Sequence, residues 1–262
     1  MAILNMIDPL YVLSGLAVGF IVGMTGVGGG SLMTPLLVLL FGIHPATAVG
    51  TDLLYAAATK ATGTAVHGWN RTVDWRIAGK LAAGSVPAAV ATLTLMYVHG
   101  MKSQGGSALI STLLGVALLL TALSLVFRTM LATLAAGRKP VSAATQGVLT
   151  VLTGAALGVL VSISSVGAGA LGVTALIMLY PRIPVSRIVG TDIAHAVPLT
   201  LVAGLGHWLL GSVDWHILGS LLVGSLPGIV MGSATAPRVP ESVLRPMLAC
   251  VLVVVGVRLM WP

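Results

Sequence analysis

The stretch Val49-Gly50-Thr51-Asp52 reappears 140 residues later in the chain as Val189-Gly190-Thr191-Asp192. At the same offset, Val73-Asp74-Trp75 reappears as Val213-Asp214-Trp215. Aligned in this register, residues 49–87 and 189–227 share 15 identities in 39 positions. Chance is a poor explanation for so many identities, so we infer an internal duplication and interpret the rest of the chain around it.

The composition places this duplication in a membrane. Of the 262 residues, 57% are apolar and 7% are charged, and the mean hydropathy is +1.07, whereas about a quarter of the residues of a soluble domain are charged. We therefore predict an all-α polytopic membrane protein. Its helical segments are bounded by charge, proline or glycine and cover residues 9–24, 30–42, 45–70, 74–98, 107–128, 145–162, 169–180, 185–211, 214–235 and 243–260.

The same composition argues against most other classes of protein. A net charge of +7 would suggest nucleic-acid binding in a soluble protein, but here the basic residues are better interpreted as topology signals. Cys250 is the only cysteine, and the sequence contains no His-x-x-x-His motif and no Gly-x-Ser-x-Gly motif. We expect no nucleic-acid partner, no metal, no cofactor and no enzymatic activity.

The basic residues also bear on how the two halves are oriented. If the first two short segments of each half enter and leave the membrane on one side, the loops near Arg71, Arg128, Arg182 and Arg238 fall on one face, which carries ten basic residues against two. If each pair of short segments instead forms one continuous span, seven basic residues fall on one face and five on the other. We therefore predict two inverted repeats of about five segments each, 1–135 and 136–262, with the basic face cytoplasmic and both termini outside. Segment length favours re-entry, while short tilted crossings remain an alternative.

Glycine-rich interruptions occur at matching places in the two halves. They predict backbone that turns at membrane depth, where such turns are tolerated only inside protein or along a cavity. Exposed N–H groups, helix N-termini and hydroxyls at these breaks predict an anion-binding site, and the alternative is that the glycines only permit close helix packing. The predicted substrate-binding residues are Thr25, Gly26, Gly28, Gly29, Gly30 and Ser31 in the first half, and Ser164, Ser165, Gly167 and Gly169 in the second.

Three ionisable side chains within the predicted spans are candidates for proton coupling. Asp52 and Asp192 lie about two turns into their helices, where ionised groups are costly. His195 follows Asp192 by three residues and shares its helix face, so the two could exchange a proton, whereas the matching residue in the first half is Tyr55. Alternatively, both acids cap the backbone of neighbouring broken helices.

The duplication also repeats two pairs of polar residues near helix ends. We expect Asp74 and Asp214 to cap the helices that follow them, and His67 and His207 to form hydrogen bonds near the membrane interface.

Lys60 is the basic residue that falls well inside a predicted span. In an inverted arrangement its depth is close to that of Asp192. It could attract an anionic substrate, form an ion pair with Asp192, or extend to the cytoplasmic face with its ammonium in water. We include Lys60 among the predicted substrate-binding residues.

The stretches Gly23-Met24-Thr25-Gly26-Val27-Gly28-Gly29-Gly30-Ser31 and His44-Pro45-Ala46-Thr47-Ala48-Val49-Gly50-Thr51-Asp52 resemble those of the TauE/SafE sulfite exporter family, also called the toluene sulfonate uptake permease family. The resemblance implies secondary transport of a small sulfur-containing anion, such as sulfite, sulfoacetate or thiosulfate, across an inner membrane, with the broken helices as the substrate site. A passive anion channel is the alternative. The expected partners are this anion and membrane lipid, and a second copy of the chain in a homodimer is a further candidate.

Overall fold

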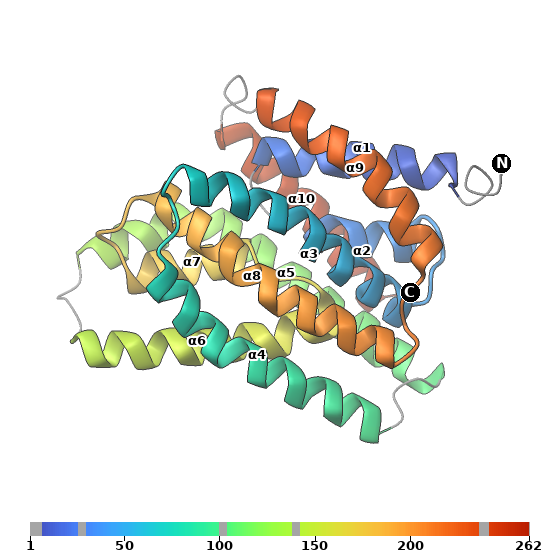
Figure 1. Ribbon diagram of the computed structural model, residues 1–262, viewed down its shortest axis with the longest axis horizontal. Helices are drawn as coiled ribbons and strands as arrows, with labels where there is room; N and C mark the ends of the chain where they lie inside the picture. Colours follow the sequence, from blue (N-terminus) through green and yellow to red (C-terminus); the bar gives the residue numbers. More distant parts are fainter. Residues whose placement is uncertain (1–6, 26–29, 100–103, 138–141, 236–240, 262) are drawn as a thin grey trace.

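The computed structural model describes residues 7–25, 30–99, 104–137, 142–235 and 241–261, which form helices and no strand (Figure 1). The all-α prediction is confirmed. The helices are α1 (Pro9–Thr25), α2 (Gly30–Leu39), α3 (Pro45–Trp69), α4 (Trp75–Val98), α5 (Gln104–Ala136), α6 (Ala143–Ser164), α7 (Ala170–Leu179), α8 (Val185–Leu209), α9 (Trp215–Thr235) and α10 (Glu241–Met260).

Helix length separates the spanning helices from the short ones. Helices α4, α6 and α8, residues 110–135 of α5 and residues 215–232 of α9 are long and apolar enough to cross a membrane. Helices α2 and α7 have 10 residues each, which gives a rise of about 15 Å, or half of a hydrocarbon core of about 30 Å. The polytopic prediction is confirmed, and α7 is too short to cross by itself.

One predicted boundary is wrong. The segment predicted as 107–128 is the helix Gln104–Ala136, because apolar residues continue beyond Arg128 and one charge does not end a helix. Arg128 was expected in a loop on the basic face. Instead it lies inside α5, and its side chain is only 8% exposed.

Helices α3 and α8 cross in antiparallel fashion at the centre of the bundle (Figure 1). Near the start of α3, Gly50 lies against the Ser212 carbonyl and the His207 side chain at the end of α8. Gly190, near the start of α8, lies in the same way against the Thr72 carbonyl and His67. A Cβ atom at either glycine would collide with these neighbours, so the repeated glycine is required by close approach of the two backbones.

The repeated threonines connect α3 and α8 to the helices α9 and α4 by hydrogen bonds. The main-chain N–H of Asp74, before α4, donates to the Thr191 hydroxyl at 2.8 Å. The N–H of Asp214, before α9, donates to the Thr51 hydroxyl at 3.0 Å. Both aspartates cap their own helices, since each carboxylate accepts N–H groups of the first turn, as predicted for these positions. Four of the repeated residues thus form two reciprocal contacts.

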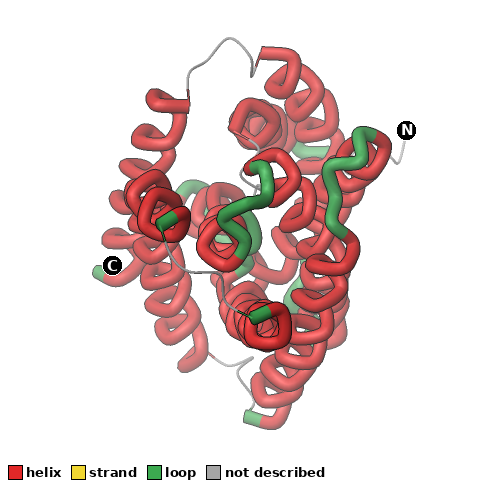
Figure 2. The backbone as a smooth tube through the Cα atoms, turned by 90° about the vertical axis from the view of Figure 1, so that its left-hand side faces the viewer, coloured by secondary structure: helices red, strands yellow, loops and turns green. Residues whose placement is uncertain are grey.

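Two outer helix pairs flank the crossing, and both are packed through glycine. Helix α4 packs along α6, where Gly84 lies against the Val151 carbonyl and Gly154 against the Leu81 carbonyl. Helix α9 packs along α1, where Gly224 lies against the Val12 carbonyl. Figure 1 shows these pairs at opposite edges of the molecule, and Figure 2 views several of the helices between them end-on.

Helices of one half pack mainly on helices of the other half, which is the pattern that a duplicated chain would produce. In each half the fourth helix packs on the first helix of the other half, while α3 packs on α8 and α5 on α10. The predicted inverted repeats and their boundary at residues 135 and 136 remain predictions, with which these pairs agree.

A substitution at the α4–α6 contact tests whether the glycines set the helix spacing. Replacement of Gly84 by alanine forces the backbones apart, and we expect a loss of about 1–3 kcal/mol of stability, as for overpacking in a core. Gly79 lies on the same helix with open space around its Cβ direction, so Gly79→Ala is the matched control and should leave stability unchanged or improve it by up to about 1 kcal/mol. Thermal unfolding in detergent measures both, and equal melting temperatures for the two variants would contradict the packing argument.

Candidate functional site

The predicted break in the second half is present between α6 and α7. Helix α6 ends at Ser164, and Ser165 follows in the left-handed conformation with φ of 57°. Gly167 and Gly169 have φ values of 115° and 136°, which side chains with a Cβ rarely adopt. Helix α7 begins immediately afterwards at Ala170. The glycines here permit a sharp turn of the backbone between two helices, rather than close helix packing alone.

The two serines of this break differ in the hydrogen bonds that their hydroxyls form. The Ser164 hydroxyl donates to the Leu160 carbonyl at 2.7 Å and accepts the Val166 N–H at 3.2 Å, so it is used in ending α6. The Ser165 hydroxyl is buried and acts on the neighbouring Asp52 carboxylate, although it forms no hydrogen bond of good geometry with a described residue. Of the two serines, Ser165 therefore belongs to the surroundings of the buried acid.

The predicted break in the first half falls partly outside the described residues. Gly26, Gly28 and Gly29 lie there. Thr25 is the last residue of α1 and Gly30 and Ser31 are the first two residues of α2, so helices end and begin at the predicted places. That the six residues of this break bind substrate remains a prediction.

Lys60 extends from the middle of α3 to the second break. Its Nζ donates a hydrogen bond of 2.8 Å to the Ala168 carbonyl, and the side chain is 6% exposed. The ammonium therefore points into the protein, and the alternative in which Lys60 reaches the cytoplasmic face is wrong. A buried cation thus lies at the break, next to the turn that leads into α7.

Asp52 joins α3 to α2 and faces the same break. It is fully buried, and its Oδ2 accepts a hydrogen bond of 2.5 Å from the Thr34 hydroxyl. The alternative in which the acids cap neighbouring broken helices fits Asp52 in part, because both the hydroxyl and the main chain of Thr34 in α2 act on its carboxylate. It does not fit Asp192, whose carboxylate accepts no hydrogen bond from the described residues. The carboxylate of Asp52 also lies close to Lys60 and Ser165.

Asp192 is buried in a different environment. Neither of its carboxylate oxygens has a hydrogen-bond partner within the described part of the chain. The carboxylate lies directly against Gly172 in the first turn of α7, where a Cβ atom would collide with Oδ1. Lys60 and Arg128 are the cations that act on it electrostatically. Asp192 is thus a buried acid with cations nearby but no bonded partner.

His195 is not bonded to Asp192. Its Nε2 forms a hydrogen bond of 2.9 Å with the Ser85 hydroxyl of α4. The matching residue in the first half, Tyr55, lies beside Ser225 of α9, which is the repeat partner of Ser85. Because both rings face a serine at equivalent helix contacts, the position has a packing role in each half. The direct proton exchange expected between Asp192 and His195 has no hydrogen bond to carry it in this conformation.

The structure adds two residues to those predicted from the sequence. One is Arg128, whose burial the sequence could have indicated because apolar residues continue on both of its sides. The other is His207, which is 1% exposed and donates through Nε2 to the Ser162 carbonyl at 2.8 Å, near the end of α6. Its repetition as His67 marked the position, but an interfacial role was expected, whereas His207 is buried and supports the break.

The charges of the site are balanced. Among the described residues, the buried aspartate, glutamate, lysine and arginine side chains are Asp52, Lys60, Arg128 and Asp192. Their formal charges are two negative and two positive, which offsets part of the cost of removing them from water. Histidine, cysteine and acidic residues form no metal-binding group within the same residues. The arrangement can attract an anion and can hold a proton.

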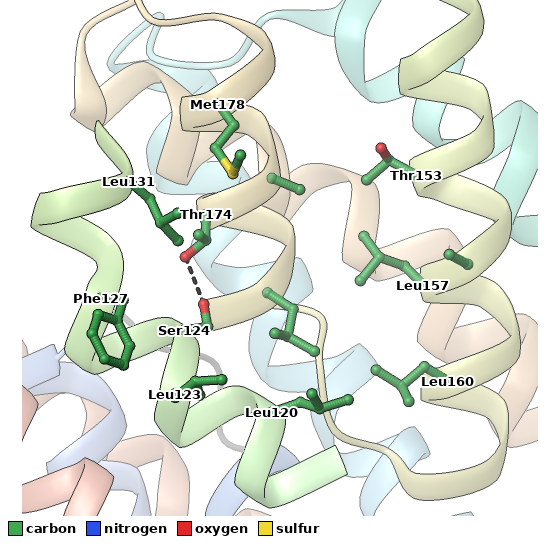
Figure 3. A pocket seen from close by; sticks show the side chains of 13 residues that line it. Leu120, Leu123, Ser124, Phe127, Leu131, Thr153, Leu157, Leu160, Thr174 and Met178 are labelled. Carbon is green, nitrogen blue, oxygen red and sulfur yellow. Dashed lines mark hydrogen bonds between the residues drawn. The ribbon is translucent and has the colours of Figure 1, made fainter. Parts of the chain in front are cut away.

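A large groove beside the break has a different character (Figure 3). It has a volume of about 670 Å³ and lies between α5 and α6 with α7 along its floor. Its described lining is mainly leucine, phenylalanine and methionine with three hydroxyls, two of which, Ser124 and Thr174, bond each other at 2.7 Å. The lining includes no charged side chain, so the groove does not provide a site for a small anion.

The bond between Thr34 and Asp52 can be tested by removing the hydroxyl. Thr34→Val leaves a buried carboxylate oxygen without its donor, and we expect a loss of about 1–3 kcal/mol of stability. Thr200→Val is the matched control, because the Thr200 hydroxyl is equally buried but bonds the Ala196 carbonyl of its own helix. Unfolding in detergent gives the comparison, and a Thr34→Val protein as stable as Thr200→Val would show that the bond contributes little.

Comparison with known proteins agrees with this geometry. Residues 11–259 match the family model described as "Sulfite exporter TauE/SafE". The chain is 39% identical over 250 residues to a probable membrane transporter protein, YjnA, of Bacillus subtilis, covering 95% of this chain and 98% of that one. It is 27% identical over 252 residues to a probable membrane transporter protein of Xylella fastidiosa, with coverage of 95% and 93%. No solved structure matches. The chain is a membrane transporter protein that belongs to the TauE/SafE sulfite exporter family.

Proposed function

We propose that this protein is a secondary transporter of small sulfur-containing anions, with sulfite, organosulfonates such as sulfoacetate, and thiosulfate as the candidate substrates. The observation that carries the proposal is the buried Lys60 ammonium, which is bonded to the Ala168 carbonyl at the turn before α7. A cation buried in a membrane protein is costly and marks a ligand or ion pathway.

The remaining groups at the break suit an oxyanion. The N-terminus of α7 supplies the positive end of a helix dipole. The Ser165 hydroxyl lies in the turn beside Asp52, and the positive φ values of Gly167 and Gly169 turn the backbone sharply there. Sulfite, sulfonates and thiosulfate each carry several acceptor oxygens around one sulfur, so a few converging donors and one ammonium can bind them without a metal. The family description favours this class of anion, while the relatives are named only as transporters.

Transport would follow from the arrangement of the helices. We infer that the two halves are inverted repeats that alternately open the site to each side, as in other transporters built from broken helices. The first break would contribute Thr25 to Ser31 from the opposite direction. The topology that accompanies this proposal is an inner-membrane protein with its basic loops in the cytoplasm and both termini outside.

Flux into proteoliposomes tests the proposal. The panel contains sulfite, sulfoacetate, taurine, thiosulfate, sulfate and chloride, each with and without an imposed proton gradient. We expect saturable transport of a sulfur anion that a gradient drives uphill. Passive movement of every anion would identify a channel instead, and no movement of any anion would contradict the proposed function.

Removing the charge of Lys60 is the sharpest test of the site. Charge-assisted hydrogen bonds contribute about 1.5–3 kcal/mol, so Lys60→Gln should raise the half-saturating anion concentration roughly 10-fold or more. Lys80→Gln is the matched control, because Lys80 is an exposed lysine near the start of α4. Gel filtration confirms that both variants are folded. An unchanged half-saturating concentration for Lys60→Gln would remove the break from the substrate site.

A further inference from the structure

We infer that Asp192 alone carries the coupling proton, and that it binds this proton together with the anion. This inference rests on the proposed function. The sequence indicates Asp52, Asp192 and His195 as candidates for proton coupling, and the structure separates them by their contacts. Of the three, only the Asp192 side chain forms no hydrogen bond with a described residue.

The two aspartates occupy equivalent places in the duplication but have different neighbours. In the register in which Thr25 matches Ser164, an offset of 139, Thr34 matches Val173. The Thr34 hydroxyl holds Asp52, whereas a valine side chain has no donor to offer Asp192. In the same register Met33 matches Gly172, and the missing side chain lets the Asp192 carboxylate lie against the first turn of α7.

The groups around Asp192 determine what can bind or protonate its carboxylate. Lys60 on α3 and Arg128 on α5 act on it electrostatically. Helices α6 and α7 contain no charged residue, and those of α4, Arg76 and Lys80, are exposed. His195, on the same helix, is bonded to Ser85. Within the described part of the chain neither cation is hydrogen-bonded to the carboxylate, so both of its oxygens remain able to accept a proton.

The charge balance then couples the anion to a proton. Without substrate, the four buried charges of Asp52, Lys60, Arg128 and Asp192 sum to zero. An anion that binds at the break beside Lys60 adds at least one negative charge in a region of low dielectric, and sulfoacetate or thiosulfate, each a dianion near pH 7, adds two. A proton taken from water onto an Asp192 oxygen neutralises one of these charges, and it is released to water when the anion leaves on the other side. Because binding linkage is reciprocal, the proton also strengthens anion binding.

Gly172 brings this proton site into contact with α7. The carboxylate lies against the first turn of α7, and the turn that precedes α7 is bonded to Lys60 through Ala168. The ammonium and the acid therefore both contact the segment that would hold the anion. Neither Asp52, which is bonded to α2, nor His195, which is bonded to α4, has this placement.

The test compares Asp192→Asn in proteoliposomes with Asp74→Asn, which lies outside the four buried charges and keeps a side chain that can cap α4. Two readouts are needed: counterflow of labelled sulfoacetate without a gradient, and its accumulation driven by a proton gradient. We expect the loss of accumulation in Asp192→Asn to exceed its loss of counterflow at least 10-fold, and Asp74→Asn to keep an accumulation that rises with the gradient. Equal proton-driven accumulation in Asp192→Asn and the wild type would overturn the inference while leaving the proposed function intact. A wild type that moves no sulfur anion in the full panel would overturn both.

A binding measurement gives an answer that does not depend on flux. Sulfoacetate is ionised near pH 7, so protons taken up when it is added to weakly buffered protein in detergent are bound by the protein, and a pH-sensitive dye reports them. We expect uptake by the wild type and none by Asp192→Asn. If that variant does not fold, Gly172→Ala replaces it, since the added methyl displaces the carboxylate, with Gly219→Ala, which has open space, as its control. Unchanged uptake in the folded variant would contradict a role for Asp192.

Discussion

The antiparallel crossing of α3 and α8 is the constraint on which the rest of the structure depends. Gly50 and Gly190 let the two helices approach the connections that follow their partners, and Thr51 and Thr191 accept the N–H groups that begin α9 and α4. Each bond ties a central helix to an outer pair, so the crossing sets where α4–α6 and α1–α9 lie. The next residue in each motif, Asp52 or Asp192, then falls inside the protein and not in lipid.

Charge at this depth is tolerable only because several charges share it. One buried ammonium or carboxylate in a hydrocarbon environment would be strongly destabilising. Here two acids and two bases come from α3, α5 and α8, and the break supplies a carbonyl for Lys60 while Thr34 supplies a hydroxyl for Asp52. The formal charges of these four side chains sum to zero, but not all of their polar atoms are hydrogen-bonded. A charged ligand that enters changes this sum, and a coupled transporter requires such a change.

Much of the fold follows from the sequence, because membrane helices are specified by long apolar runs and by the residues that interrupt them. The ten segments, the caps at Asp74 and Asp214, and the break at residues 165–169 were predicted on these grounds. The length of α5 was not, since Arg128 resembles a boundary until its buried position is known. The bond between Lys60 and Ala168 joins residues 108 positions apart, and the partners of Asp52 and His195 lie on other helices. No local sequence pattern encodes such contacts, so the sequence indicates candidate residues but not their partners.

The duplication separates two kinds of residue. Gly50 with Gly190 and Thr51 with Thr191 are identical in both halves, and they lie where backbones touch or where a hydroxyl accepts the N–H before the next helix. The positions that differ surround the charges: Lys60 matches Thr200, whose hydroxyl only bonds its own helix, and Thr34 matches Val173. Two perfectly equivalent halves would give two equivalent acids and no reason for a proton to prefer one. Because the donor and the ammonium both come from the first half, the acid of the second half is left unbonded beside the break, and a symmetric framework acquires a single site at which charge can change.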